Sequence, residues 1–127
     1  MTRKVTAAIA ALLAVSALAF TSAALAKDGD VRVAGRCTGA ATSKLKLSGE
    51  DGRIEVEFEV DQNRSGVRWQ VVLRRNGARF FTGSRVTRPP SGSFELRRLT
   101  ANGPGRDVIT ARATSPSGQV CRATARF

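Results

Sequence analysis

The sequence contains no histidine and no tyrosine, and only two cysteines among its 127 residues. Without histidine, a Ser-His-Asp or Cys-His catalytic site cannot form. Two cysteines alone are also too few ligands for a zinc site. A Ser-Lys site is formally open, but Lys44 and the neighbouring Ser43 are expected to point to opposite faces of a strand. We therefore predict that the protein is not an enzyme and holds no metal or cofactor.

Long apolar runs are also scarce, and the clearest one lies near the start of the chain, from Val5 to about Phe20. It follows two basic residues and precedes the small-residue site Ala24–Ala26, which is the pattern of a secretory signal peptide. A membrane anchor is the alternative, but the run is shorter than the roughly 20 apolar residues of a spanning helix. We predict a cleavable signal helix over residues 1–26. The mature part, residues 27–127, is predicted to be a single secreted domain without a transmembrane segment.

Acidic residues are few, with 10 Asp and Glu against 21 Lys and Arg, and the formal net charge is +11. Most of the basic residues are arginines, and most arginines lie in the second half of the chain. A net charge of this size affects solubility and non-specific association with anions rather than the fold. A bias in genomic base composition would also raise the arginine content. The positions of the arginines therefore matter more than their number.

The two cysteines, Cys37 and Cys121, are predicted to form one disulfide, because an exported chain meets an oxidising environment. Two free thiols, or a bridge between two molecules, are the alternatives. On the chain-entropy model, closing so long a loop stabilises the folded state by about 4 to 5 kcal/mol. For one small domain, that would be a large part of the total stability.

The mature sequence alternates apolar and polar residues in twos, and Gly, Asn, Ser and Pro punctuate the alternation. This period is typical of half-buried strands, whereas no period of 3.6 residues recurs. Seven or eight short strands over about a hundred residues predict an all-β antiparallel sandwich. The predicted strands are Val31–Cys37, Ser43–Ser48, Arg53–Asp61, Val67–Arg74, Arg79–Thr87, Ser93–Leu99, Arg106–Thr114 and Gln119–Phe127.

Three glutamates, Glu55, Glu57 and Glu59, alternate with apolar residues on one predicted strand. The turn at Gly49–Gly52 would place Leu47 opposite Ile54, and would bring lysines of the preceding strand beside Glu55 and Glu57. Such cross-strand ion pairs stabilise a sheet by about 0.2 to 1 kcal/mol each. A glycosidase-like pair of carboxylates is the alternative, but it needs a cleft that raises one pKa. We therefore interpret the glutamates as the polar side of a half-buried strand.

The Asn76–Gly77 dipeptide is the strongest hairpin signal in the chain, because both positions of a type I′ turn need positive φ. The predicted register pairs Leu73 with Phe80 inside the sandwich and Val72 with Phe81 outside. A register that differs by one residue would exchange the two phenylalanines. Another turn, at Ser115–Gly118, would align Ala113 with Cys121 and Ala111 with Ala123.

The region from about Val31 to Phe127 resembles the immunoglobulin-like domains of small secreted bacterial proteins. The residues that carry the resemblance are Trp69 in "VRWQV", the segment "SGSFEL" at Ser91–Leu96, and "GRDVITARAT" at Gly105–Thr114 with the hairpin that follows it. The resemblance implies an immunoglobulin-like β-sandwich. The sequence departs from antibody-type domains because no cysteine lies near Phe58 or Ala111, and because tyrosine is absent. This architecture hosts many unrelated functions, so the resemblance implies the fold alone.

The predicted registers gather arginines on the outer side of one sheet. Opposed like charges destabilise a sheet unless salt screens them or an anion lies between them. Guanidinium groups bind phosphate and carboxylate through two parallel hydrogen bonds. The candidate anion-binding residues are Arg68, Arg74, Arg79, Arg112, Arg122 and Arg126.

These observations favour a secreted binding or structural module whose basic sheet face contacts an anionic wall polymer or an acidic glycan. Nucleic acid would bind only non-specifically, and a solvated face without a ligand remains open. The alternative is a protein-binding module, such as an inhibitor, that acts through loops 61–66 and 100–106 or through a patch formed by Val72 and Phe81. Salt distinguishes the two hypotheses, because polyanion binding weakens steeply as salt rises.

Overall fold

The computed structural model describes residues 29–127, which form nine strands and no helix. The predicted signal peptide lies outside the described residues. Within residues 29–127, no helix could cross a membrane. The strands are β1 (Val31–Ala34), β2 (Arg36–Cys37), β3 (Thr42–Glu50), β4 (Arg53–Asp61), β5 (Arg68–Arg75), β6 (Ala78–Val86), β7 (Ser93–Ala101), β8 (Val108–Thr114) and β9 (Val120–Arg126).

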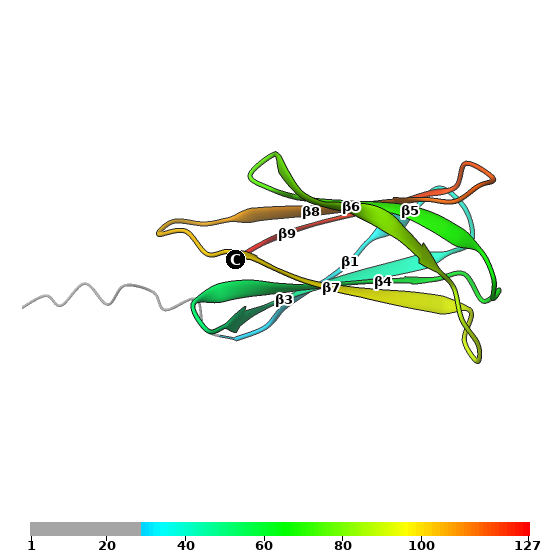
Figure 1. Cartoon of the computed structure of the whole chain (residues 1–127), viewed down its shortest axis with the longest axis horizontal. Coiled ribbons are helices and arrows are strands. Elements are labelled where there is room, and N and C mark those ends of the chain that lie inside the picture. The colour runs from blue at the N-terminus through cyan, green and yellow to red at the C-terminus, as the bar shows by residue number, and fades with distance from the viewer. Residues whose placement is uncertain (1–28) are drawn as a thin grey trace, which may run out of the picture.

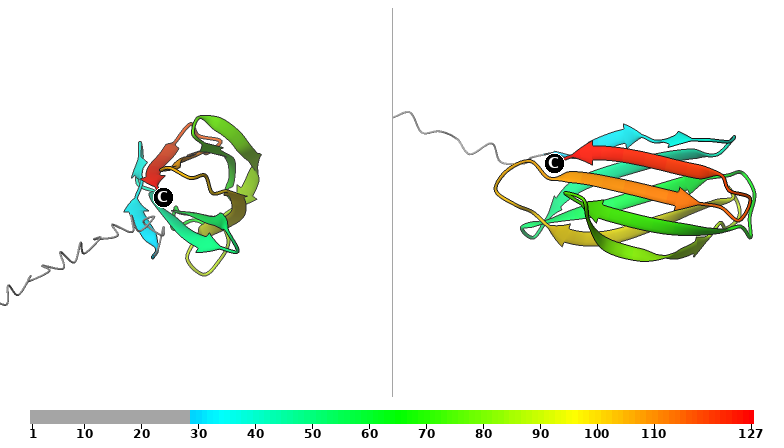
Figure 2. Two further views of the ribbon diagram at one scale, coloured as in Figure 1. Left: turned by 90° about the vertical axis from the view of Figure 1, so that its left-hand side faces the viewer. Right: turned by 90° about the horizontal axis from the view of Figure 1, so that it is seen from above.

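The strands form two antiparallel sheets that pack face to face, as the two layers in Figure 1 show. Sheet A has the order β1-β3-β4-β7, and sheet B has the order β2-β9-β8-β5-β6. The right-hand view of Figure 2 looks onto the outer side of sheet B, with β9 in red and β8 in orange. The predicted all-β antiparallel sandwich is confirmed.

The first predicted strand is divided between the two sheets, which explains why nine strands form instead of seven or eight. Residues before Gly35 pair with β3 in sheet A, and residues after it pair with β9 in sheet B. A Cβ atom at Gly35 would lie 1.9 Å from Ser43 Oγ and 2.8 Å from the backbone oxygen of Arg122. The chain can therefore cross from one sheet to the other at this point because glycine has no side chain.

Alternating side chains of both sheets form a single core, as a half-buried strand pattern requires. Trp69 is fully buried at its centre, and its indole Nε1 donates a hydrogen bond of 3.0 Å to Gln62 Oε1. Phe94 packs against both Trp69 and Phe58, with ring centroids 6.5 Å and 6.4 Å away. The largest fully buried side chains are Trp69, Phe58, Leu45, Leu47, Ile54, Leu73, Leu96 and Ile109.

The predicted register between β3 and β4 is wrong by two residues. Leu47 pairs with Val56 instead of Ile54, although both residues still face the core. The strands extend to Glu50 and Arg53, so Asp51 and Gly52 alone make the turn, with φ values of 46° and 74°. This two-residue turn with positive φ matches the twist of the flanking strands better than a four-residue loop does.

The β5–β6 hairpin turns at Asn76–Gly77 as predicted, with positive φ at both residues. A register irregularity beside Leu73 and Arg74, however, pairs Leu73 with Phe81. Phe80 falls between the paired positions, and both phenylalanines pack partly against the core. The bulge moves Phe81 to the inner side, so the predicted pairing of Leu73 with Phe80 is wrong.

Candidate functional site

The outer side of sheet B carries seven arginines, which we call the basic face. They are Arg36, Arg68, Arg74, Arg79, Arg112, Arg122 and Arg126. Six of them are the residues that the sequence predicts for this face. Arg36 is the addition, and it comes from β2, the short strand whose position the sequence pattern does not show.

Three of these arginines form a continuous row across neighbouring strands. Arg36 on β2 pairs with Arg122 on β9, and Arg122 pairs with Arg112 on β8. The row continues to Val72 on β5, which is half-buried. The register predicted from the Ser115–Gly118 turn, with Ala113 opposite Cys121, is confirmed and places Arg112 opposite Arg122. Neighbouring strands lie about 4.8 Å apart, so the row is a dense line of positive charge.

No acidic residue compensates this charge within the sheet. The five strands of sheet B contain no Asp or Glu. Among the described residues, none of the seven arginines forms an ion pair. Arg68 donates a hydrogen bond of 2.9 Å to Ser84 Oγ, which leaves its charge unpaired. The basic face thus keeps its guanidinium groups available to an anion.

Sheet A differs from sheet B, because acidic and basic side chains form ion pairs on its outer side. Lys46 Nζ lies 3.4 Å from Glu57 Oε2, and Arg97 Nη2 lies 2.6 Å from Glu57 Oε1. Arg97 also contacts Glu95 and Glu55. The row of glutamates therefore lies on the outer side of a half-buried strand, among basic partners.

The surroundings of Arg97 fix its charge. A hydrogen bond from its Nε to Glu95, followed by the negative charge of Glu57, raises the pKa of the Arg97 guanidinium above its ordinary value. The charge of Arg97 is paired with neighbouring glutamates, whereas the arginines of the basic face form no ion pair within residues 29–127.

Phe81 does not belong to the basic face, and the predicted Val72/Phe81 patch is wrong. Val72 pairs with Thr82 and points outward, whereas Phe81 pairs with Leu73 and points inward. The Phe81 ring lies beneath two guanidinium groups, at 5.4 Å from Arg85 and 4.6 Å from Arg98. These inward-pointing charges cover the edge between β6 and β7, which is a common way to protect open strand edges.

The two loops that the alternative hypothesis invokes lie at opposite ends of the sandwich (Figure 1). Loop 61–66 is fixed by hydrogen bonds, since Gln62 N donates to Gly92 O and Gly66 N donates to Thr87 O. Loop 100–106 is held by a hydrogen bond of 2.8 Å from Gly103 N to Asp107 Oδ2. A single partner surface cannot include both loops without also covering the body of the domain.

A groove of about 530 Å³ runs beside β2 and β9 at the edge of the basic face. We call it the β2–β9 groove, and its lining residues are Ala34, Arg36, Cys37, Thr38, Val120, Arg122, Ala123 and Thr124. The lining includes no acidic residue. A second hollow, of about 320 Å³, lies over sheet A, but its lining includes Glu57, Glu59 and Glu95 as well as basic residues. Of these two hollows within residues 29–127, the β2–β9 groove is the one whose charged lining residues are all positive.

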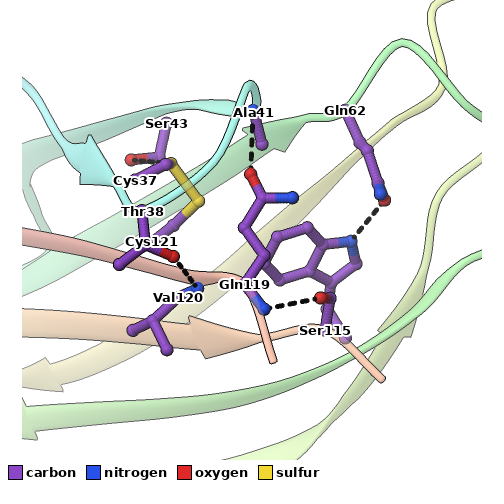
Figure 3. Close-up of a disulfide and its surroundings, with 10 residues drawn as sticks. Cys37, Thr38, Ala41, Ser43, Gln62, Ser115, Gln119, Val120 and Cys121 are labelled. Carbon is purple, nitrogen blue, oxygen red and sulfur yellow. Dashed lines mark hydrogen bonds between the residues drawn. A yellow bond between two sulfur atoms is a disulfide. The ribbon is translucent and has the colours of Figure 1, made fainter. Parts of the chain in front are cut away.

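The predicted disulfide between Cys37 and Cys121 is present and fastens β2 to β9 (Figure 3). Cys121 is fully buried, and Cys37 is partly buried beside Ser43. A disulfide is expected in a non-reducing environment. Within residues 29–127, no group of three or more His, Cys, Asp or Glu side chains could hold a metal ion.

Comparison with known proteins gives no relative from which a function could be transferred. No protein family model matches the chain, and no curated protein matches it.

Proposed function

We propose that the protein is a secreted, non-enzymatic binding module whose basic face contacts an anionic polymer of the cell envelope. The observation that carries the proposal is the row of unpaired arginines in a sheet without acids. Opposed like charges are unfavourable in the free protein, and an anionic chain lying along the row would remove that repulsion. The disulfide supports an extracellular location.

The chemistry of the face favours a polymer that is recognised by charge. None of the paired outer positions of sheet B carries an aromatic ring, so bases or sugar rings have no platform for stacking. Val72 is a single apolar contact and is only partly exposed. The face therefore fits a flexible chain of phosphate or carboxylate groups better than a nucleobase or an apolar protein surface.

The test is retention of the purified, oxidised protein on an immobilised glycerol-phosphate polymer and on polygalacturonate across a salt series. The variant R112E/R122E reverses the charge at the centre of the row. The control R64E/R106E changes the net charge equally in exposed loops. We expect retention to fall as salt rises, and R112E/R122E to bind at least about tenfold more weakly than the control.

Equal losses in the two variants would overturn the proposal, because net charge alone would then explain retention. Absence of retention at low salt would also overturn it. Binding to a protein partner that is insensitive to salt would instead support the alternative, an interaction module that acts through one of its loops. Comparing retention on the two immobilised polymers shows whether the basic face prefers phosphate or carboxylate.

A further inference from the structure

We propose that the β2–β9 groove binds one phosphate group of the monoester type, held between the guanidinium groups of Arg36 and Arg122. The inference rests on the proposed function, since it names the terminal group through which an anionic chain would be anchored at the edge of the basic face. The groove extends over both arginines and over two threonines, Thr38 and Thr124. Each of these side chains can donate hydrogen bonds to an oxyanion.

The position of the two arginines suits convergence on a single anion. Arg36 and Arg122 are direct partners across β2 and β9, so their Cβ atoms are about 4.5 to 5.5 Å apart on the same side of the sheet. Two long side chains starting this close can both reach one tetrahedral group, each with two parallel hydrogen bonds. Beyond Arg122 the edge of β9 has no paired strand, because the chain leaves it at Gly35.

The hydroxyl groups complete the set of donors. Thr38 Oγ1 accepts a hydrogen bond of 3.0 Å from Val120 N, so its own hydrogen remains available to donate. Thr124 lies two residues beyond Arg122 and points to the same side. No carboxylate lines the groove to compete for these donors.

Charge favours a phosphate monoester over a carboxylate. The two guanidinium groups carry two positive charges, and a monoester carries about −1.5 to −2 at neutral pH. A carboxylate carries one negative charge and would leave one of the two arginines uncompensated. A third arginine, Arg112, lies next in the row and is placed to contact a following anionic group of the same chain.

A disulfide and hydrogen bonds on the residues that follow fix the backbone that carries Arg36. The disulfide joins the residue after Arg36 to Cys121 (Figure 3). Thr38 N donates to Val120 O at 2.9 Å, and Ala41 N donates to Gln119 Oε1 at 2.9 Å. Binding groups are most effective when the backbone that carries them is held in place before the ligand arrives. These contacts hold Arg36 opposite Arg122 in the free protein.

The experiment is an NMR titration of ¹⁵N-labelled, oxidised protein with inorganic phosphate, and separately with acetate, at constant ionic strength. The test variant R36K/R122K keeps the charge but removes the forked guanidinium groups. The matched control R74K/R79K alters another cross-strand arginine pair of the basic face that lies outside the groove. Well-dispersed spectra establish that both variants are folded.

We expect phosphate to shift the signals of Arg36, Thr38, Arg122 and Thr124, and acetate to bind more weakly. R36K/R122K should lose about tenfold in phosphate affinity, which corresponds to one charge-assisted hydrogen bond, and R74K/R79K should lose little. Three results would each overturn the inference. They are equal phosphate affinities in all three proteins, signal shifts spread over the whole basic face, and an affinity for acetate equal to that for phosphate.

Failure of the groove is distinguishable from failure of the proposed function. If R36K/R122K binds phosphate like the wild type while R112E/R122E still loses retention on the polymers, the groove assignment falls and the basic face stands. If phosphate binds in the groove but the protein is retained on neither polymer, the assignment of the groove stands and the proposed polymer ligand is wrong. The retention assay and the titration use the same oxidised protein.

Discussion

At the scale of single residues, Asp107 is the only acidic residue that is buried within residues 29–127. Its carboxylate forms an ion pair with Arg75 Nη2 at 2.8 Å, and it accepts hydrogen bonds from Asn76 Nδ2 at 3.0 Å and Gly103 N at 2.8 Å. Its backbone exchanges two hydrogen bonds with Phe127. One side chain thus joins the β5–β6 turn to the β7–β8 loop, and its backbone fixes the end of the chain.

We expect D107A to lower the free energy of unfolding by about 3 kcal/mol, because it leaves Arg75 and two other donors without their acceptor. The control is D30A, which breaks exposed ion pairs with Arg32 and Lys46 at 3.2 Å and 3.6 Å. The control should lose less than about 1 kcal/mol. Urea unfolding followed by tryptophan fluorescence measures both. Similar losses in the two variants would contradict the assigned role of Asp107.

Arg36 shows where residue-level prediction from sequence reaches its limit. Once Cys37 and Cys121 lie on neighbouring antiparallel strands, the residues before and after them must also pair, which places Arg36 opposite Arg122. A disulfide between Cys37 and Cys121 does not by itself require adjacent strands. The sequence predicts the disulfide, but the pairing of the first and last strands depends on tertiary packing.

At the scale of strands and turns, prediction succeeds where one turn geometry is strongly preferred. The Ser115–Gly118 turn determines the β8–β9 register correctly. At Gly49–Gly52, two turns compete, and Asp51 adopts positive φ so that the shorter one forms. The bulge beside Phe80 has no local signal, because packing of Phe81 against the core determines which residue is left out.

Gly35, where the chain crosses from one sheet to the other, allows a test of whether this crossing requires glycine. We expect G35A to lower the free energy of unfolding by about 1 to 3 kcal/mol, because its Cβ would collide with Ser43 Oγ and with the backbone of β9. Gly105 is the matched control, since a Cβ there meets nothing within 4 Å and its φ is not positive. Thermal unfolding compares the two alanine variants. If both behave like the wild type, the close approach at Gly35 is not a constraint.

At the scale of the whole molecule, charge is divided between the two sheets. Sheet A neutralises its charges within its own outer side, through contacts such as those of Glu57 with Lys46 and Arg97. Sheet B leaves the seven arginines of its basic face without ion pairs, with Arg112 directly opposite Arg122. The sequence shows which strands contain acids, but the division becomes visible only when each strand is assigned to a sheet. The free protein therefore carries a repulsion that the fold does not relieve.

This repulsion should be measurable without a ligand. We expect R112Q/R122Q to raise the free energy of unfolding by about 0.5 to 1 kcal/mol at about 0.01 M salt, where charges interact over about 30 Å. At about 1 M salt the screening length is about 3 Å, and the difference from the wild type should disappear. R64Q/R106Q removes the same net charge from exposed loops and should stabilise less at low salt. Stabilisation that is equal in both variants, or that persists at high salt, would contradict local repulsion. A substitution that stabilises the free protein while weakening its retention on a polyanion would show that the arginine row is maintained at the expense of stability, as binding sites commonly are.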